Sequence, residues 1–289
     1  MGAPVSYFDV CRLLIKAVTK SRELLEQEEA MTTFQSIVLT GASRGIGRAL
    51  AMRLARPGTR LCLIARNLDG LSETADACRT RGAVVETHSV DVADRPALSQ
   101  AVLAFDATNP VDLVIANAGI SAGLEPGRQP EADGVTTRIN AINFLGAVNT
   151  VEPLLAPMID RGQGQIAFVC SLAALRPQPD LPSYSASKAG LRAYGIALRG
   201  ALRETGVDVT VVSPGFVTSD MSARHHGLKP FEVSADRAAE IIAKGLECRK
   251  AHVTFPWQLA SLIWLSNRLP PRLSDRFVQG FKSWIEPDD

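Results

Sequence analysis

The sequence has little net charge, few cysteines and no long apolar run, and each shortage excludes a class of protein. Its 31 basic and 30 acidic side chains leave a formal net charge of +1, so nothing electrostatic points to a nucleic acid partner. The five cysteines form no Cys-x-x-Cys pair and no metal-ligand spacing with the four histidines, so we expect reduced thiols, no metal site and a cytoplasmic location.

Membrane and export signals are also scarce. Charged residues interrupt the apolar N-terminus, which argues against a signal peptide, and no stretch approaches the roughly 18 apolar residues of a membrane span. We therefore expect a soluble protein or, at most, one that lies on a membrane surface.

What the sequence does contain is an alternation of two patterns. Short apolar runs rich in β-branched residues lie at 36–41, 60–65, 83–90, 111–119, 165–171, 207–215 and 252–255. Longer segments with helical spacing separate them, such as 67–81, 95–107, 135–161, 184–204 and 234–248. Strands that alternate with helices favour a parallel sheet with helices on both faces, so we predict a doubly wound α/β fold.

The segment VLTGASRGIG, residues 38–47, joins the first apolar run to a predicted helix. A helix N-terminus presents unpaired backbone N–H groups and the positive end of the helix dipole, which together bind phosphate. Glycine at 41, 45 and 47 would let an anion approach the backbone closely. The spacing differs from the Gly-x-Gly-x-x-Gly fingerprint of many dinucleotide-binding loops.

This spacing resembles the TGxxxGxG loop of the short-chain dehydrogenase/reductase family, and further segments follow in the family's order. They are Asp91 in VDVAD, NAG at 117–119, and SPG at 213–215 with Thr218. The resemblance covers roughly residues 36–256 and implies a Rossmann-type domain that binds a dinucleotide. Carried over residue by residue, it implies cofactor contacts from Gly41, Ser43, Arg44, Gly45, Ile46, Gly47, Arg66, Asp91, Asn117, Ala118, Gly119, Tyr184, Lys188, Pro214, Gly215 and Thr218.

The end of the second predicted strand bears on which dinucleotide binds. An enzyme that uses NAD carries a carboxylate there for the ribose 2′-hydroxyl, whereas this chain has Ala65 followed by Arg66. Arg44, in the glycine loop, can approach the same place from the other side. Two arginines and no acid favour the 2′-phosphate of NADP(H), and Asp69 is expected in the first turn of the next helix.

The segment YSASK places Tyr184 and Lys188 on one face of a predicted helix. Tyrosine has an ordinary pKa of about 10, and a neighbouring ammonium together with an oxidised nicotinamide would lower it. Ser171 ends a predicted strand thirteen residues before Tyr184, which is the family's interval. The resemblance implies that Ser171, Tyr184, Lys188 and Asn143 are catalytic, with Asn143 holding a water beside Lys188. Asn140 is the rival to Asn143.

Together these residues predict an NADP-dependent oxidoreductase that reduces a ketone to a secondary alcohol, with Tyr184 as general acid. The predicted substrate pocket is apolar, which suits a lipid-like, oxoacyl or steroid-like ketone. Its walls are expected from Ile120, Leu172, Leu181 and Phe216. Two alternatives remain open: a non-catalytic NADP-binding sensor or scaffold with the same fold, and an epimerase or dehydratase like the extended relatives that share Tyr-x-x-x-Lys.

Several other features lead to further expectations. Cys170 should face the core, and His225 and His226 should lie in a solvated loop of the substrate lid. Members of the family commonly form oligomers, so the resemblance implies a homodimer or homotetramer through the helices that hold Asn143 and Tyr184.

The two ends of the chain lie outside the alternation, so we divide it into an extension over 1–30, a catalytic domain over 31–256 and an extension over 257–289. The first extension has the apolar stripe of an amphipathic helix. The second is apolar and aromatic, and it contains arginines. It suits three places: packed over the substrate pocket, buried in a subunit interface, or lying at a membrane surface.

Overall fold

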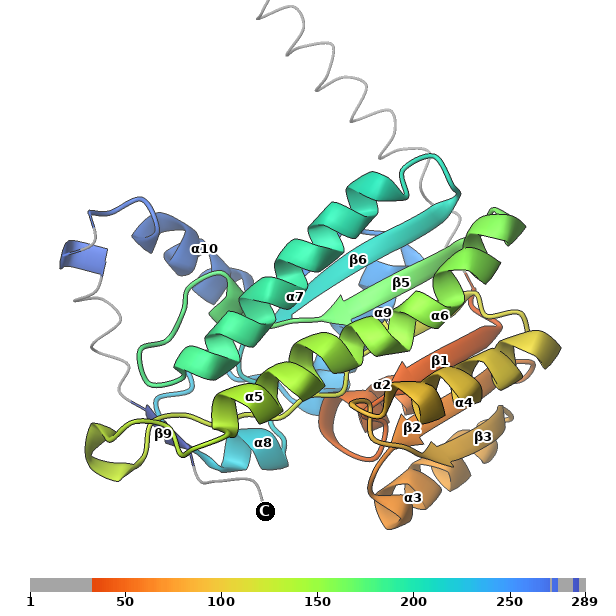
Figure 1. The fold of residues 1–289 in the computed structure, drawn as a ribbon, viewed down its shortest axis with the longest axis horizontal. Helices are drawn as coiled ribbons and strands as arrows, with labels where there is room; N and C mark the ends of the chain where they lie inside the picture. Colours follow the sequence, from red (N-terminus) through yellow and green to blue (C-terminus); the bar gives the residue numbers. More distant parts are fainter. Residues whose placement is uncertain (1–32, 271, 275–282, 286–289) are drawn as a thin grey trace, which may run out of the picture.

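The structure, a computed structural model, describes residues 33–270, 272–274 and 283–285. Its centre is a sheet of seven parallel strands in the order β3-β2-β1-β4-β5-β6-β8 (Figure 1). The strands are β1 (Ser36–Thr40), β2 (Arg60–Ala65), β3 (Val84–Ser89), β4 (Leu113–Ala116), β5 (Gly164–Val169), β6 (Val207–Pro214) and β8 (His252–Phe255). All seven predicted strands are present, and the doubly wound α/β prediction is confirmed.

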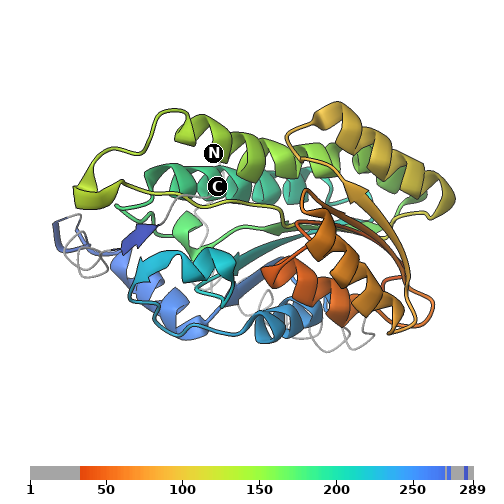
Figure 2. The same ribbon diagram turned by 90° about the horizontal axis from the view of Figure 1, so that it is seen from below.

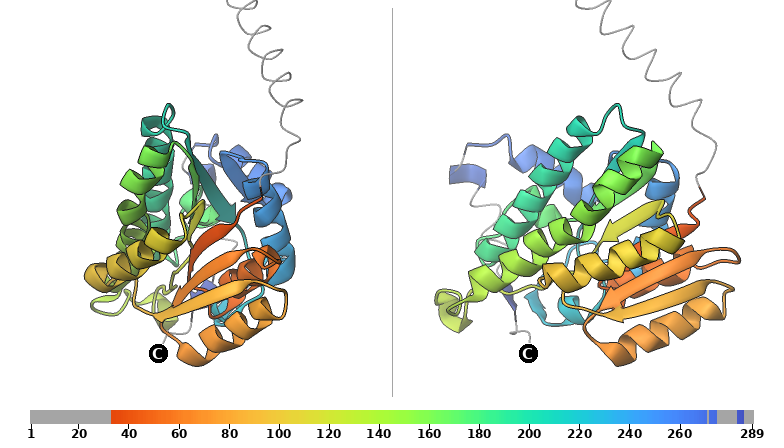
Figure 3. Two further views of the ribbon diagram at one scale, coloured as in Figure 1. Left: turned by 90° about the vertical axis from the view of Figure 1, so that its right-hand side faces the viewer. Right: turned by 45° about the vertical axis from the view of Figure 1, so that its right-hand side comes forward.

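Helices cover both faces of this sheet, as Figures 2 and 3 show from two directions. One layer consists of α2 (Gly45–Leu54), α3 (Leu68–Arg79) and α9 (Ala235–Glu247), and the other of α4 (Arg95–Thr108), α5 (Val135–Asn140), α6 (Gly146–Arg161) and α7 (Pro182–Ala201). Neighbouring residues of one strand therefore enter different apolar clusters, Leu39 the first and Val38 the second. Because both of their faces are buried, the five inner strands have mainly continuous apolar sequences, whereas the edge strands β3 and β8 contain exposed polar residues.

The segment 135–161 has helical spacing throughout, but in the structure a turn of π-helix, η2 (Ala141–Leu145), separates α5 from α6. Such turns are frequent at functional sites, and this one contains Asn143. By length and apolar character the whole segment is a candidate membrane span, but half of its apolar window is buried inside the protein. A core helix of a folded domain gives the same signal.

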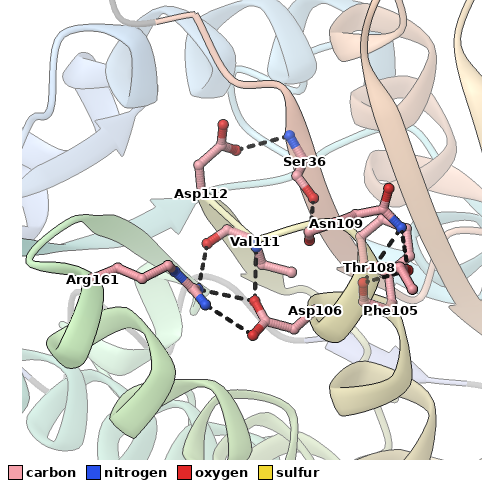
Figure 4. Close-up of polar contacts among 8 residues, drawn as sticks. All are labelled: Ser36, Phe105, Asp106, Thr108, Asn109, Val111, Asp112 and Arg161. Carbon is pink, nitrogen blue, oxygen red and sulfur yellow. Dashed lines mark hydrogen bonds and ion pairs between the residues drawn. The ribbon is translucent and has the colours of Figure 1, made fainter.

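The amino ends of the strands are held by a polar network (Figure 4). The Asp106 carboxylate, at the end of α4, accepts two hydrogen bonds from Arg161 of α6, both 2.9 Å long, and one of 2.8 Å from the Val111 N–H. Asp112, at the start of β4, accepts the Ser36 N–H of β1. This edge of the sheet is therefore closed by hydrogen bonds between its own elements, and the opposite edge contains the cavity described below.

The parts of the chain beyond the main alternation form a second, smaller arrangement. A short helix, α8 (Asp220–Ala223), leads into β7 (His225–Gly227), which pairs antiparallel with β9 (Ser283–Ile285) near the end of the chain. Between them in sequence lies α10 (Trp257–Ser266), which follows β8. The predicted helix within 1–30 lies outside the described residues, and the division into 1–30, 31–256 and 257–289 stays a prediction.

Candidate active site

A cavity of about 820 Å³ lies at the carboxyl edge of the sheet. It is lined by the residues that follow β1, β2, β4, β5 and β6. In a parallel sheet these strand ends meet at one edge, and the chain reverses its strand order between β1 and β4, which opens a crevice there. The fold therefore brings together the motifs that the sequence placed at successive strand ends.

The three glycines of the loop after β1 have different reasons to lack a side chain. A Cβ on Gly47 would lie 2.0 Å from the Gly41 carbonyl oxygen, and one on Gly41 would lie 2.8 Å from the Ala118 Cα atom. Gly45 has a φ of +54°, and its nearest neighbour would be the Ser219 side chain at 3.4 Å. Close backbone packing thus requires Gly41 and Gly47, whereas Gly45 is needed for its backbone conformation at the cavity.

The N-terminus of α2 fits an anion. Arg44 occupies the N-cap position in an extended conformation and provides no side-chain cap, so no side chain caps the first N–H groups of this ten-residue helix. Ser43, Gly45 and Ile46 line the cavity beside them. This arrangement binds phosphate through N–H groups and the helix dipole.

Two arginines flank the part of the cavity next to β2. The Arg44 and Arg66 side chains both line it, and each lies 3.6 Å from a carboxylate, that of Asp220 and that of Asp91 respectively. Ala65 closes β2, and Asp69 lies in the first turn of α3, as the sequence predicted. At the strand end itself there is thus a cation and no acid.

Asn117 and Asn143 position the loop that follows β4. The Asn117 amide donates to the carbonyl oxygens of Thr40 and Gly41, at 3.0 and 3.2 Å, and thereby fixes this loop to the glycine loop. The buried Asn143 accepts the Ile120 N–H at 2.8 Å and donates to the Ile120 carbonyl at 2.9 Å. Both amides therefore form hydrogen bonds with backbone groups of the site. Asn143 itself is not among the residues that line the cavity.

The predicted catalytic side chains meet in the middle of the cavity. Ser171 follows β5, and Tyr184 and Lys188 lie on the first turns of α7, so all three line the cavity. The Lys188 ammonium is buried, donates to the Val169 carbonyl at 2.9 Å and lies 6.0 Å from the centre of the Tyr184 ring. The Ser171 oxygen accepts the Ala173 N–H at 3.1 Å, which holds its side chain in place.

Burial dominates the electrostatics of this group. It raises the pKa of Tyr184 above its ordinary value, and the hydrogen bond with Ser171 offsets part of that rise. It also lowers the pKa of Lys188. The sequence led us to expect a lowered pKa for Tyr184. In the chain without cofactor the pKa of Tyr184 is raised instead, because the expected lowering depends in part on the positive charge of an oxidised nicotinamide.

The far part of the cavity is apolar. Leu172, Leu259 and Ile263 form a buried cluster there with the partly buried Phe216. Ile120 and Leu181 line the same cavity, as does Ile285 of β9. The polar residues Arg176 and Gln178 also line it. Such a space accommodates an apolar molecule that ends in a polar group.

Two predicted features differ in the structure. Thr218 does not line the cavity, because its backbone N–H and hydroxyl both donate to the Val233 carbonyl. His225 is buried, lies against the Phe216 ring at 5.1 Å and lines the cavity, so the expectation of a solvated loop is wrong for it. The same expectation holds for His226, which is exposed. Cys170 is buried as expected, which raises its pKa to about 12.

Sequence reasoning missed the cavity residues that come late in the chain. They are Leu259, Ile263 and Ile285, whereas Leu228 and Pro230 belong to the lid over 219–233 that the sequence predicted at the pocket. The stripe formed by Leu259 and Ile263 was visible in the sequence, but a stripe does not say which surface it covers. Nothing local marks Ile285. Among the residues the structure describes, no group of His, Cys, Asp and Glu could hold a metal ion.

Comparisons with known proteins agree with this geometry. The family model "short chain dehydrogenase" matches residues 35–227. An uncharacterized oxidoreductase of Myxococcus xanthus is 37% identical over 250 residues, which cover 85% of this chain and 97% of that protein. The ketoacyl reductase HetN of a Nostoc species is 36% identical over 65% of this chain and 66% of its own.

A solved structure shares the fold. A variant of actinorhodin polyketide ketoreductase, crystallised with NADPH, superposes with a TM-score of 0.66 at 26% identity. The match covers 76% of this chain and 94% of that chain. The fold is therefore one already seen in a ketoreductase.

Proposed function

This chain belongs to the short-chain dehydrogenase family, is an oxidoreductase, and, we propose, reduces a hydrophobic ketone to a secondary alcohol with NADPH. The observation that carries the proposal is that one cavity contains three parts, each suited to one part of the reaction. One end is an uncapped helix N-terminus flanked by Arg44 and Arg66, the middle holds Ser171, Tyr184 and Lys188, and the far end is apolar.

The residues divide the chemistry between them. When bound, the dinucleotide supplies the hydride for the carbonyl carbon. The Tyr184 hydroxyl gives its proton to the carbonyl oxygen, and the Ser171 hydroxyl donates a hydrogen bond to that oxygen as negative charge develops on it. The raised pKa of Tyr184 keeps it protonated at neutral pH, as an acid for reduction must be. Lys188, held by the Val169 carbonyl, is placed to bind the ribose hydroxyls and to stabilise the phenolate that remains.

The preference for NADPH is supported by the two arginines and by the missing carboxylate at the end of β2. NADP is also bound in the structure of the similar polyketide ketoreductase. Because the Arg44 and Arg66 side chains are about half exposed, we expect each to contribute about tenfold to affinity for the 2′-phosphate. Replacing both by alanine should raise the KM for NADPH far more than the KM for NADH. Equal changes would show that these arginines do not contact the 2′-phosphate.

The substrate class follows from the apolar walls. Leu172, Leu259, Ile263 and Phe216 offer no partner for sugar hydroxyls, so oxoacyl, steroid-like and long-chain ketones fit better. The similarity to the ketoacyl reductase HetN supports the oxoacyl class. We also propose a homodimer or homotetramer through α6 and α7 in the cytoplasm. In support, α6 has an exposed Ile159, and the described cysteines are free thiols.

The test is NADPH oxidation with a panel drawn from those three ketone classes. We expect turnover with at least one class, and Tyr184→Phe should abolish turnover while NADPH still binds. A chain that binds NADPH but turns over none of the panel would be a sensor or scaffold, and full activity in Tyr184→Phe would refute the mechanism. Tightly retained NAD in the purified protein would instead favour an epimerase or dehydratase.

A further inference from the structure

The helix α10 has an outer face unlike that of a soluble surface helix. It contains no charged residue, yet Trp257, Trp264, Leu265 and Leu262 are exposed by 71%, 59%, 56% and 42%. Leu269 and Leu273 continue the exposed apolar surface beyond its end. A surface helix normally places charged side chains toward water, and a contiguous apolar patch marks a binding surface. We call these six residues the outer face of α10.

Along the sequence, the charged residues from Arg249 to Arg272 are all basic, and the next acidic residues are Glu247 before this segment and Asp275 after it. No acidic residue occurs between Cys248 and Ser274. Arg268 lies over the Trp264 ring, with its guanidinium carbon 3.2 Å from the ring centre, and Arg272 is exposed next to Leu273. Tryptophan beside arginine, on an otherwise apolar helix, is the composition of a segment that lies in the interface of a bilayer, with the cations at the lipid phosphates.

A second copy of the chain fits this surface less well. In a twofold interface the same patch meets itself, so Arg268 and Arg272 of both copies would be brought into one interface. The patch contains no carboxylate to pair with them. An anionic lipid surface offers both the apolar layer and the negative charge.

The inner face of the same helix belongs to the cavity. Leu259 and Ile263 are each 8% exposed and line the apolar part of the cavity. Figures 1 and 3 show α10 at the periphery of the molecule, away from the central sheet. A single helix thus separates the apolar end of the cavity from the outer face.

From these observations we propose that the outer face of α10 binds the surface of an anionic lipid bilayer. The helix then lies in the membrane interface while its inner face forms the cavity wall. Resting on the proposed function, this location would let a hydrophobic ketone pass between the bilayer and the cavity.

The experiment measures binding of the full chain to vesicles of phosphatidylcholine with and without phosphatidylglycerol. Of the three tryptophans of the chain, Trp257 and Trp264 lie on α10 and Trp284 lies on β9, so the emission lost when Trp257 and Trp264 are replaced is the part that reports on α10. We expect co-sedimentation with the anionic vesicles, a shift of the emission to shorter wavelength, and weaker binding to neutral vesicles. Replacing Arg268 and Arg272 by glutamine should reduce the anionic preference by about fivefold per residue.

A triple variant tests the apolar part. Trp257→Gln with Trp264→Gln and Leu265→Gln should lower vesicle binding on the order of 100-fold. The matched control is Leu68→Gln with Val84→Gln and Leu103→Gln, three exposed apolar residues on α3, β3 and α4, which should bind as the unchanged chain does.

Three results would overturn the proposal. They are no vesicle binding by the full chain, equal binding by the two triple variants, and a lipid-free dimer that only the α10 variant converts to a monomer. Binding that appears only after residues 1–32 are removed would also overturn it, because that segment would then be the occupant. Reductase activity on a water-soluble ketone without vesicles is measured separately, so failure of the proposed function is distinguishable.

Discussion

Asn143 offers the sharpest test of how the site is held together. The family resemblance implies a catalytic part for this residue, and the structure gives its side chain three hydrogen bonds. It accepts the Ile120 N–H at 2.8 Å, donates to the Ile120 carbonyl at 2.9 Å and donates to the Ser187 hydroxyl at 3.1 Å. The perturbation is Asn143→Leu, which keeps the branch at Cγ and removes all three bonds; because Leu is larger than Asn, overpacking at this buried position adds to the loss of stability.

The cost follows from what is left unpaired. Asn143 is 0% exposed, so water cannot replace its amide beside Ile120. A buried donor or acceptor without a partner costs about 1–3 kcal/mol, and two such groups on Ile120 give a loss of about 2–6 kcal/mol in the free energy of unfolding. A domain of ordinary stability, about 5–15 kcal/mol, survives the lower part of that range. A shift of the loop would also disturb Gly119, where a Cβ would lie 3.3 Å from the Lys188 ammonium.

Urea denaturation followed by circular dichroism measures the loss, and kinetics with NADPH measure its effect on the site. The control is Asn140→Leu, since Asn140 donates only to the Thr136 carbonyl of its own helix, at 2.8 Å. We expect the control to change the free energy of unfolding by under about 1 kcal/mol. If Asn143→Leu is as stable as Asn140→Leu, the argument that Asn143 holds the loop after β4 is wrong.

Three further predictions concern single groups. Gly47→Ala should prevent NADPH binding and lower the free energy of unfolding by about 1–3 kcal/mol, because its Cβ would lie 2.0 Å from the Gly41 carbonyl oxygen. The control is Gly200→Ala in α7, where a Cβ would have nothing within 4 Å, so this substitution should be neutral or stabilising. Burial raises the pKa of Tyr184, so in the chain without cofactor its tyrosinate absorbance should appear only above a pH of about 10. Subtracting the titration of Tyr184→Phe from that of the unchanged chain isolates this absorbance, and a step near neutral pH would contradict the prediction. A thiol reagent at pH 8 should modify the partly exposed Cys248 at once. It should modify Cys170 only when the chain unfolds, because burial raises the pKa of that thiol to about 12. Prompt modification of both thiols would contradict the burial of Cys170.

The fold was predictable because its signals are local and repeated. The five inner strands of this sheet are buried on both faces, so each is a short, mainly apolar run bounded by glycine or polar residues, as in β1 and β4. The edge strands β3 and β8 are partly exposed, and polar residues interrupt them. The sheet then dictates where motifs go, since the ends of parallel strands meet at one edge. That is why Ser171, at a strand end, could be placed near the glycine loop without any structure.

The detailed contacts were not predictable, because they depend on which atoms become unpaired after packing. Asn117 was expected at the cofactor, yet its amide satisfies two carbonyl groups of the neighbouring loop. Thr218 was expected there too, and its bonds to Val233 follow from how the segment after β6 folds back. His225 has polar neighbours in the sequence, but Phe216 and the pairing of β7 with β9 bury it.

Chemistry and selectivity belong to different parts of this chain. Ser171, Tyr184 and Lys188 lie within residues 35–227, where the family model matches, and the parallel sheet fixes their positions. The apolar walls come in part from later segments, through Leu259 and Ile263 of α10 and through Ile285 of β9, which lie beside Leu172 and Phe216. Those segments attach at the periphery: β9 pairs with β7 in a separate two-stranded sheet, and α10 follows the edge strand β8. Peripheral segments can change without disturbing the sheet. The motifs that identify the reaction therefore carry little information on the substrate, and the residues after Gly227 are where it must be sought.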